Sequence, residues 1–246
     1  DMDIDYVIYE VGLGGRLDAT NVVAPMIAGI TTIGHDHMGV LGESLPEIAR
    51  EKLGIVKQGV PLCSSVNNEE LLPIFESYTQ KHNSSFFKVL AKDIVVQEYG
   101  NTTTFKYKDS FYKINMIGTH QPVNASLAIE IIHQLNKMNK ATVSEESIKA
   151  GLFQTYWPGR LERFGNVILD GAHNVEGAIA LKESMETYFK GQKIKVLYTS
   201  MADKEYFDII KIIEKFAHEI YFTTFDYPRC ETADNLYQVS DFNHKY

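Results

Sequence analysis

The chain has 246 residues, of which 44% are hydrophobic and 23% charged, the balance of an ordinary globular protein with a sizeable core. Its formal net charge of −8 excludes general nucleic-acid binding, which needs a basic surface. No apolar stretch approaches the ~20 residues of a membrane-spanning helix, and the only cysteines, Cys63 and Cys230, supply neither a disulfide framework nor a cysteine-rich zinc site. We therefore expect a cytoplasmic protein with no nucleic-acid or membrane partner.

The first element is a predicted strand. Residues 4–9 are rich in β-branched and aromatic side chains and favour a buried central strand that delivers Glu10 to its carboxyl end. Open α/β sheets bind ligands beyond that end, so Glu10 is a candidate functional carboxylate. A solvated or salt-bridged glutamate is the open alternative. The glycine turn at 12–15 is not a dinucleotide fingerprint, because Leu17 stands where the third glycine is needed.

A second strand, 27–33, ends in Gly-His-Asp-His at 34–37. His37 would then lie at the same sheet edge as Glu10 and is a candidate ligand. A capping or core histidine is the alternative.

The next element is a helix predicted over 44–58. Ser44 and Glu47 form a capping box, with Pro46 in the first turn. Lys52 falls on the apolar stripe of this helix, where the stem of a snorkelling lysine packs while its ammonium reaches water. The other reading is a lysine whose charge is cancelled or chemically altered beside a metal ion or a phosphate.

The remaining elements alternate in two series. Residues 1–156 are interpreted as a first α/β domain and 157–246 as a second, smaller α/β domain, because strands and helices alternate in both. The first domain continues with strands 60–65 and 85–90, helix 69–82, an antiparallel meander of 94–99, 102–107 and 111–116, and helices 122–137 and 144–155. The second has strands 166–170, 194–199 and 219–224, helices 175–189 and 204–217, and a tail, 241–246, with no closing element.

The second domain repeats the pattern of a strand, an acidic residue and a glycine turn. Asp170 ends strand 166–170, and His173 precedes the following helix. An aspartate there can accept hydrogen bonds from ribose hydroxyls, and a histidine at a helix N-terminus can meet a phosphate. A simple helix cap by Asp170 or Asn174 is the alternative.

Six motifs in a fixed order carry a family resemblance. The chain resembles folylpolyglutamate synthases and bifunctional dihydrofolate synthases, members of the Mur ligase superfamily, through the runs at 10–21, 36–37, 50–55, 120–124, 158–162 and 170–174. This resemblance implies an ATP-dependent ligase that adds L-glutamate to a folate, as in tetrahydrofolylpolyglutamate, or to dihydropteroate through an acyl phosphate. It also implies that 1–156 is an incomplete P-loop-type mixed-sheet ATPase domain of the α/β class and that 157–246 is a smaller Rossmann-like α/β domain. ATP and Mg²⁺ as cofactors and a monomeric state are implied as well.

The resemblance implies roles residue by residue. Glu10 and His37 match magnesium ligands, and Lys52 matches a carbamylated lysine that also faces the metal; a bare ammonium would repel the ion. His173 is taken with Lys52 as catalytic. The nucleotide and substrate matches are Asn124 for adenine, Arg160 for phosphate, Asp170 for ribose, and Leu17, Asp18 and Ala19 for the pterin.

One family motif is absent from the sequence. No Gly-x-x-x-x-Gly-Lys-[Ser/Thr] phosphate-binding loop occurs. We therefore expect an internal fragment of the ligase that lacks the N-terminal P-loop region and the extreme C-terminus and that is inactive alone. Two alternatives stay open: another Mur-type amino-acid ligase, and a non-catalytic nucleotide-binding protein.

Overall fold

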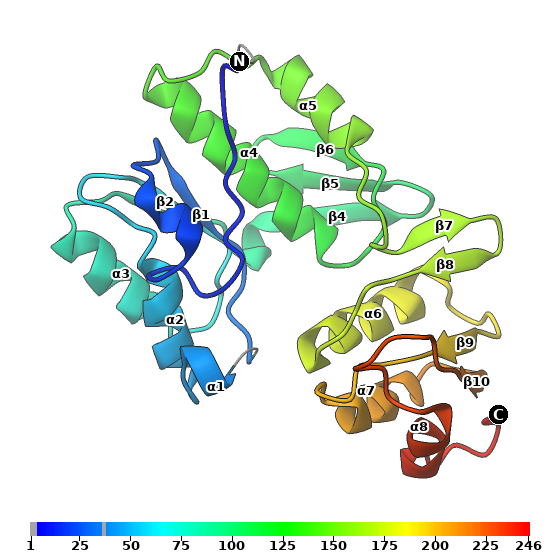
Figure 1. The fold of residues 1–246 in the computed structure, drawn as a ribbon. Helices are drawn as coiled ribbons and strands as arrows, with labels where there is room; N and C mark the ends of the chain where they lie inside the picture. Colours follow the sequence, from blue (N-terminus) through cyan, green and yellow to red (C-terminus); the bar gives the residue numbers. More distant parts are fainter. Residues whose placement is uncertain (1–3, 36–37) are drawn as a thin grey trace. The chain divides into compact units, whose positions relative to one another are not determined.

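The structure is a computed structural model that describes residues 4–35 and 38–246 (Figure 1). Contacts divide the chain into two compact units. The first unit holds the described residues up to Val95, with Tyr107–Asp109 and Val123–Lys149, and the second holds Val96–Lys106, Ser110–Pro122 and Ala150–Tyr246. Because the chain passes between the units several times, this division does not test a single boundary between residues 156 and 157, which stays a prediction.

The first unit is built on a parallel sheet. Its strands are β1 (Ala28–Ile30), β2 (Leu62–Ser64) and β3 (Phe86–Lys88), in that order, with Ala28 opposite Leu62 and Leu62 opposite Phe86. Helix α2 (Leu45–Leu53) lies between β1 and β2 in the chain, and α3 (Leu72–Lys81) lies between β2 and β3. Their apolar faces share one core, whose fully buried members include Leu53, Leu62, Leu71 and Phe75. The alternation predicted from the sequence is confirmed here.

Helix α2 begins where the sequence predicts. The Ser44 hydroxyl accepts from the Glu47 N–H, and the Glu47 carboxylate accepts from the Ser44 N–H, so both halves of the capping box are present. The helix ends earlier than expected, at Leu53, with Gly54 as its C-cap. Lys52 is only half-buried, whereas Ile48 is fully buried. The predicted stripe continues beyond Lys52 to the buried Val56, so Lys52 lies at the margin of the core.

The predicted strand at 4–9 is wrong for this structure. None of residues 4–10 is in a strand, and the side chains of Val7 and Ile8 are 58% and 96% exposed. A strand needs a neighbour to complete its hydrogen bonds, and β1 is an edge of its sheet, with no described strand beside residues 4–9. The segment is held instead by contacts such as that of the Tyr6 hydroxyl, which donates to the Lys140 carbonyl at 2.7 Å. Glu10 is therefore not delivered by a buried strand.

A second sheet and two helices follow. The sheet has the order β4 (Ile94–Tyr99), β5 (Thr103–Tyr107) and β6 (Ser110–Ile114), which confirms the three predicted strands of the meander. Alternate side chains of β5 are buried, as the pleat of a strand with one covered face requires. The helices are α4 (Gln121–Lys137) and α5 (Glu145–Gln154). Both match their predicted ranges within two residues.

The last part of the chain contains two small sheets. β9 (Lys195–Tyr198) and β10 (Glu219–Phe222) are parallel, and helices α6 (Val175–Tyr188) and α7 (Tyr206–Ile213) alternate with them. β8 (Val167–Leu169) was expected to start the same series, but it pairs antiparallel with β7 (Glu162–Phe164), a strand that the sequence analysis did not predict. The reason is the short link: residues 165–166 join the two strands as a hairpin, and Gly165 has a φ of +60°.

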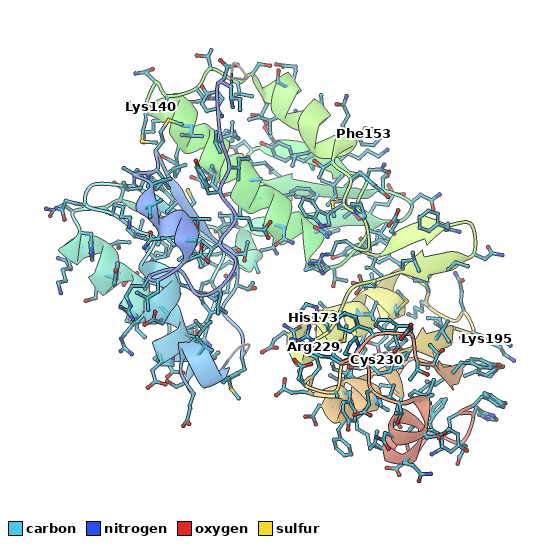
Figure 2. The ribbon with its side chains drawn as sticks, viewed as in Figure 1. Lys140, Phe153, His173, Lys195, Arg229 and Cys230 are labelled. Carbon is cyan, nitrogen blue, oxygen red and sulfur yellow. The ribbon has the colours of Figure 1, made fainter. Side chains whose placement is uncertain are left out.

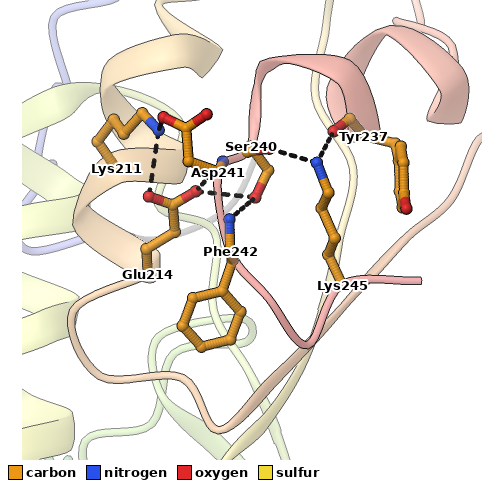
Figure 3. Close-up of polar contacts among 7 residues, drawn as sticks. All are labelled: Lys211, Glu214, Tyr237, Ser240, Asp241, Phe242 and Lys245. Carbon is orange, nitrogen blue, oxygen red and sulfur yellow. Dashed lines mark hydrogen bonds and ion pairs between the residues drawn. The ribbon is translucent and has the colours of Figure 1, made fainter.

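The tail is closed by elements that the sequence analysis missed. Helix α8 (Ala233–Val239) precedes it, and residues 244–246 pair with β10, where the Ile220 N–H donates to the His244 carbonyl at 3.0 Å. Figure 3 shows the polar contacts that hold the turn between α8 and the tail. Glu214 accepts from the Ser240 hydroxyl at 2.8 Å and from the Asp241 N–H at 3.0 Å, while Lys211 bonds Asp241 at 2.6 Å.

Three short elements complete the described chain: η1 (Ala19–Val22), α1 (Met38–Leu41) and η2 (Ala91–Asp93). None of the described helices is both long and apolar enough to span a bilayer. Both cysteines are free, as expected. Burial raises the pKa of the Cys63 thiol to about 12, so this thiol stays protonated and unreactive at neutral pH.

Candidate functional site

The glycine turn of the first unit is docked on the C-terminal end of α2. The Arg16 N–H donates to the Glu51 carbonyl at 2.9 Å. The Asn21 side chain donates to the carbonyls of Arg16 at 3.0 Å and of Gly54 at 3.1 Å, and thereby joins loop and helix end. The Lys57 ammonium, which follows the end of α2, also donates to the Asn21 carbonyl at 3.0 Å and adds a further link between helix end and loop. Loop 12–22 is therefore fixed to the helix that carries Lys52.

Two glycines make this approach possible. A Cβ at Gly54 would lie 2.4 Å from the Cβ of Arg16, and a Cβ at Gly15 would lie 2.8 Å from the Lys52 carbonyl oxygen. Both distances are far inside van der Waals contact, so any larger residue would push the loop off the helix. The Gly-Gly-Arg and Leu-Gly-Ile segments of the two motifs are thus one packed contact.

Asp18 organises the loop from within. One carboxylate oxygen accepts from the N–H groups of Gly12 at 3.0 Å and Leu13 at 2.9 Å, and the other accepts from the N–H and hydroxyl of Thr20 at 2.9 and 2.6 Å. These bonds, led by that of the Thr20 hydroxyl, lower the pKa of Asp18 to about 2. The acceptor capacity of the carboxylate is filled. The side chains left for a ligand are those of Leu17, which is 79% exposed, and Ala19.

The expected metal ligands are not assembled by the described residues. Glu10 is exposed, and His37 lies outside the residues that the structure describes. Within the described part of the chain, no hydrogen bond or ion pair joins Glu10 to Lys52, and no group of three His, Cys, Asp or Glu side chains is placed to hold a metal. Asn124 occupies the first turn of α4 with its side chain exposed. The roles of these residues stay predictions.

The second unit brings two of the sequence motifs together. The Gly171 N–H donates to the Gly159 carbonyl at 2.8 Å, so the loop at 158–162 lies against the turn at 170–174. Asp170 joins them from its two oxygens, which accept from the Leu161 N–H and the Ala172 N–H, each at 2.9 Å. The exposed Arg160 side chain lies in the same loop pair. Sequence reasoning missed Leu161, a buried residue with a φ of +47° in the left-handed region.

His173 lies just before the first turn of α6 (Figure 2). Its Nδ1 is 2.9 Å from the Gly171 carbonyl oxygen. A carbonyl only accepts, so Nδ1 carries the proton, and in the neutral ring Nε2 keeps a lone pair. The ring is exposed. Asn174 caps α6 by accepting from the Gly177 N–H at 2.9 Å, so the capping alternative holds for Asn174, while Asp170 and His173 bond the turn itself.

His120 is a second residue that the sequence analysis left without a role. Its Nδ1 is buried and has no hydrogen-bond partner among the described residues, and its Nε2 lies 3.2 Å from Nε2 of Gln121. Burial lowers the pKa of His120, although the negative charge of Asp170 acts in the opposite direction. The ring is therefore neutral at pH 7. The signal in the sequence that could have pointed to His120 is its place at the start of the motif at 120–124.

Comparison with known proteins places this arrangement in a family. The family model described as the Mur ligase middle domain matches residues 1–132, more than half of the chain, and the Mur ligase, glutamate ligase domain matches residues 159–245. The chain is 41% identical to a dihydrofolate synthase/folylpolyglutamate synthase of Bacillus subtilis over 98% of its own length and 59% of that protein.

Solved structures agree with this match. A folylpolyglutamate synthase from Thermotoga maritima superposes with a TM-score of 0.79 at 30% identity, over 96% of this chain and 56% of the other. A Mycobacterium tuberculosis folylpolyglutamate synthase complexed with ADP and AMPPCP gives a TM-score of 0.78 at 25% identity, over 93% and 54%. The chain thus spans less than two thirds of each relative. The predicted α/β fold class is confirmed, since both Mur ligase domains are matched in the predicted order, and the chain belongs to the Mur ligase family.

Proposed function

We propose that the protein containing this chain is an ATP-dependent ligase that adds L-glutamate to a folate, including tetrahydrofolylpolyglutamate, and to dihydropteroate. The names of the relatives support this activity, since the Bacillus subtilis protein is a dihydrofolate synthase/folylpolyglutamate synthase. The geometric observation that carries the proposal is the bridge made by Asp170 between the turn at 170–174 and the loop that holds Arg160. This bridge holds the loop that carries Arg160 against the turn that carries Asp170, so both motifs present their side chains from one docked pair of loops.

The proposed reaction has two steps. The γ-phosphoryl group of ATP moves to a carboxylate oxygen of the folate or pteroate, leaving ADP. The amine of L-glutamate then attacks the acyl carbon, loses a proton and displaces inorganic phosphate, so that an amide remains. Catalysis of such transfers rests on positioning and on neutralising negative charge.

In the second unit, the proposed roles follow from the hydrogen-bond donors and acceptors that these side chains have free. Arg160 neutralises phosphate, and the remaining lone pairs of Asp170 accept from ribose hydroxyls. Because the Nδ1 proton of His173 faces the Gly171 carbonyl, Nε2 is the atom that can accept a proton from an attacking amine, and we propose His173 as a catalytic residue. In the first unit, Asn124 on α4 is proposed to bind adenine.

In the first unit, loop 12–22 is proposed to hold the pterin. Both carboxylate oxygens of Asp18 accept hydrogen bonds from the loop itself. Asp18 therefore contributes by holding Leu17 and Ala19 in one geometry. This refines the sequence-based role of Asp18 from a direct contact to a positioning residue.

We keep ATP and Mg²⁺ as the cofactors. Glu10 supplies one exposed carboxylate, the oxygen ligand that Mg²⁺ prefers, and His37 and a carbamylated Lys52 are the other proposed ligands. Bound Mg²⁺ would neutralise phosphate charge. The described residues do not bring three ligating side chains together. A cytoplasmic location and a monomeric state complete the proposal.

A substrate panel tests the function. The complete gene product is incubated with ATP and L-glutamate plus dihydropteroate, tetrahydrofolate or neither, and ADP release and the ligated product are measured. We expect ADP release that depends on both the pterin substrate and glutamate. Turnover only with another acid, such as a nucleotide-linked muropeptide, would point to a different Mur-type ligase. ATP binding without turnover on any acid would point to a non-catalytic nucleotide-binding protein.

A further inference from the structure

The first unit carries a groove that the proposed reaction does not use. It has a volume of about 490 Å³. Most of its lining comes from α2 and α3, and these two helices lie side by side in the first unit (Figure 1). Its lining residues are Arg16, Arg50, Glu51, Pro73, Ile74, Ser77, Tyr78 and Lys81. Three of these eight are cations and one is an anion, in a chain whose net charge is −8.

One of the three cations is held in a fixed position. The Nε of Arg16 donates to both Glu51 oxygens, at 3.1 and 3.2 Å, and its Nη2 lies 3.1 Å from Oε1. The Arg16 side chain is still 56% exposed, so other guanidinium N–H groups remain open to a ligand. The Glu51 carboxylate is thus engaged in an ion pair that orients the Arg16 guanidinium.

The other two cations have no carboxylate partner of this kind. Arg50 and Lys81 are exposed, and within the described residues neither is within ion-pair distance of an acidic side chain. Ser77 and Tyr78 add hydroxyl groups to the same lining. Glu47 attracts Arg50 electrostatically but forms no ion pair with it. The groove therefore offers two positive charges that no described carboxylate holds in an ion pair, together with hydrogen-bond donors, to an anionic ligand.

The position of Arg16 connects the groove to the loop proposed to hold the pterin. Arg16 precedes Leu17 directly, and its backbone is fixed to α2 by the Glu51 carbonyl. Resting on the proposed function, we propose that the groove binds the oligo-γ-glutamyl tail of the folate substrate. That tail carries one carboxylate on each residue, so a longer tail presents several negative charges in a row, which matches a lining with several cations.

The experiment compares tail lengths in the complete gene product. KM is measured for tetrahydropteroyl monoglutamate and triglutamate in the wild type, Arg50→Ala, Lys81→Ala and the double variant. We expect the ratio of KM for triglutamate to KM for monoglutamate to rise about 1.5- to 5-fold for each lost charge, the range of exposed ion pairs. Lys92→Ala, which removes an exposed lysine outside the lining, is the control and should leave this ratio unchanged.

A second experiment measures ligand binding to the groove directly, so that it does not depend on turnover. Tri-γ-glutamate peptide and inorganic phosphate are titrated into the wild type and the double variant, and binding is followed calorimetrically. Peptide binding that the double variant weakens supports the proposal. An unchanged KM ratio, equal peptide binding by wild type and double variant, or phosphate binding as tight as that of the peptide would overturn it. Failure of the proposed function is a separate result: no ligation of any folate by the wild type.

Discussion

The backbone N–H of Leu161, a residue with a φ of +47°, donates to Oδ2 of Asp170 at 2.9 Å. A left-handed leucine costs of order 1–3 kcal/mol and persists only where its surroundings hold it. Here the surroundings are the Asp170 carboxylate and the burial of the Leu161 side chain. The same carboxylate that we propose for ribose thus fixes the loop that carries Arg160.

Asp170→Ala should therefore weaken both folding and nucleotide binding. The variant leaves the N–H groups of Leu161 and Ala172 without their acceptor, and we expect a loss of about 1–3 kcal/mol in the free energy of unfolding. Urea unfolding and calorimetric titration of ATP measure the two effects. Asp203→Ala, which removes an exposed partner of Arg229, is the matched control and should cost less than about 1 kcal/mol. Equal stability losses in the two variants would contradict the bridging role.

His120 should make stability depend on pH. Burial lowers its pKa in the folded state below the ordinary 6.5, so the unfolded state binds the proton more tightly. The stabilisation is complete above the unfolded pKa and declines as the pH falls below about 6.5, until the folded ring is also protonated. Urea unfolding at pH 7.5, 6.5 and 5.5 should show this slope, and His120→Gln should reduce it.

The charge of Asp170 acts on the same ring. Because Asp170 raises the pKa of His120, Asp170→Asn should lower that pKa further, and an NMR titration of the His120 ring reads it directly. A His120 pKa at or above 6.5 in the wild type would show that the ring is not desolvated as described.

Asp18 should titrate near pH 2. Thr20→Ala removes the largest cause of its low pKa, the Thr20 hydroxyl, so the pKa should rise from about 2 toward the ordinary 3.8. Because the folded pKa is the lower one, the contribution of this carboxylate is complete above the unfolded value and is lost as the pH falls through the folded value. Carboxyl NMR of the wild type and of Thr20→Ala tests this, with the exposed Thr32→Ala as control. An Asp18 pKa that Thr20→Ala leaves in place would be inconsistent with the bonding described.

Lys52 should act through an anion. In the complete gene product, we expect Lys52→Ala to abolish ligation and acetate or another short carboxylic acid to restore part of it by supplying the missing oxygens. Lys52→Arg keeps the positive charge but cannot form the carbamate, so it should be as inactive as Lys52→Ala. An active Lys52→Arg variant, or no rescue of Lys52→Ala, would return Lys52 to the role of a half-buried snorkelling lysine.

The elements that the sequence predicts well are those whose signals are local. The capping box of Ser44 and Glu47 and the three-stranded meander with its short polar turns depend on residues close together in the chain, and both are found. The strand at 4–9 failed because its composition reports propensity, whereas a strand also needs a partner with which to pair. The hairpin of β7 and β8 was missed for a related reason, since its three-residue strands carry too little pattern to be distinguished from a loop.

In the candidate site, too, the individual motifs could be predicted from the sequence, whereas the contacts between them could not. The motifs at 158–162 and 170–174 were each visible in the sequence, but their contact through Asp170 and Leu161 joins residues nine positions apart and needs the fold. The half-buried state of Lys52 and the internal bonding of Asp18 were likewise hidden, because spacing along a helix or loop does not reveal which acceptors are already filled.

The pairing of residues 244–246 with β10 affects how the molecule behaves toward its own copies. The Ile220 and Phe222 N–H groups donate to the carbonyls of His244 and Tyr246, at 3.0 and 2.9 Å. Uncovered, this side of β10 would present a row of free backbone donors and acceptors, the template on which strands of other molecules add. Residues 244–246 thus act as a cover against edge-to-edge aggregation, and Tyr246→Pro, which removes the N–H that donates to the Ile220 carbonyl, would be expected to lower solubility before it affects any ligand.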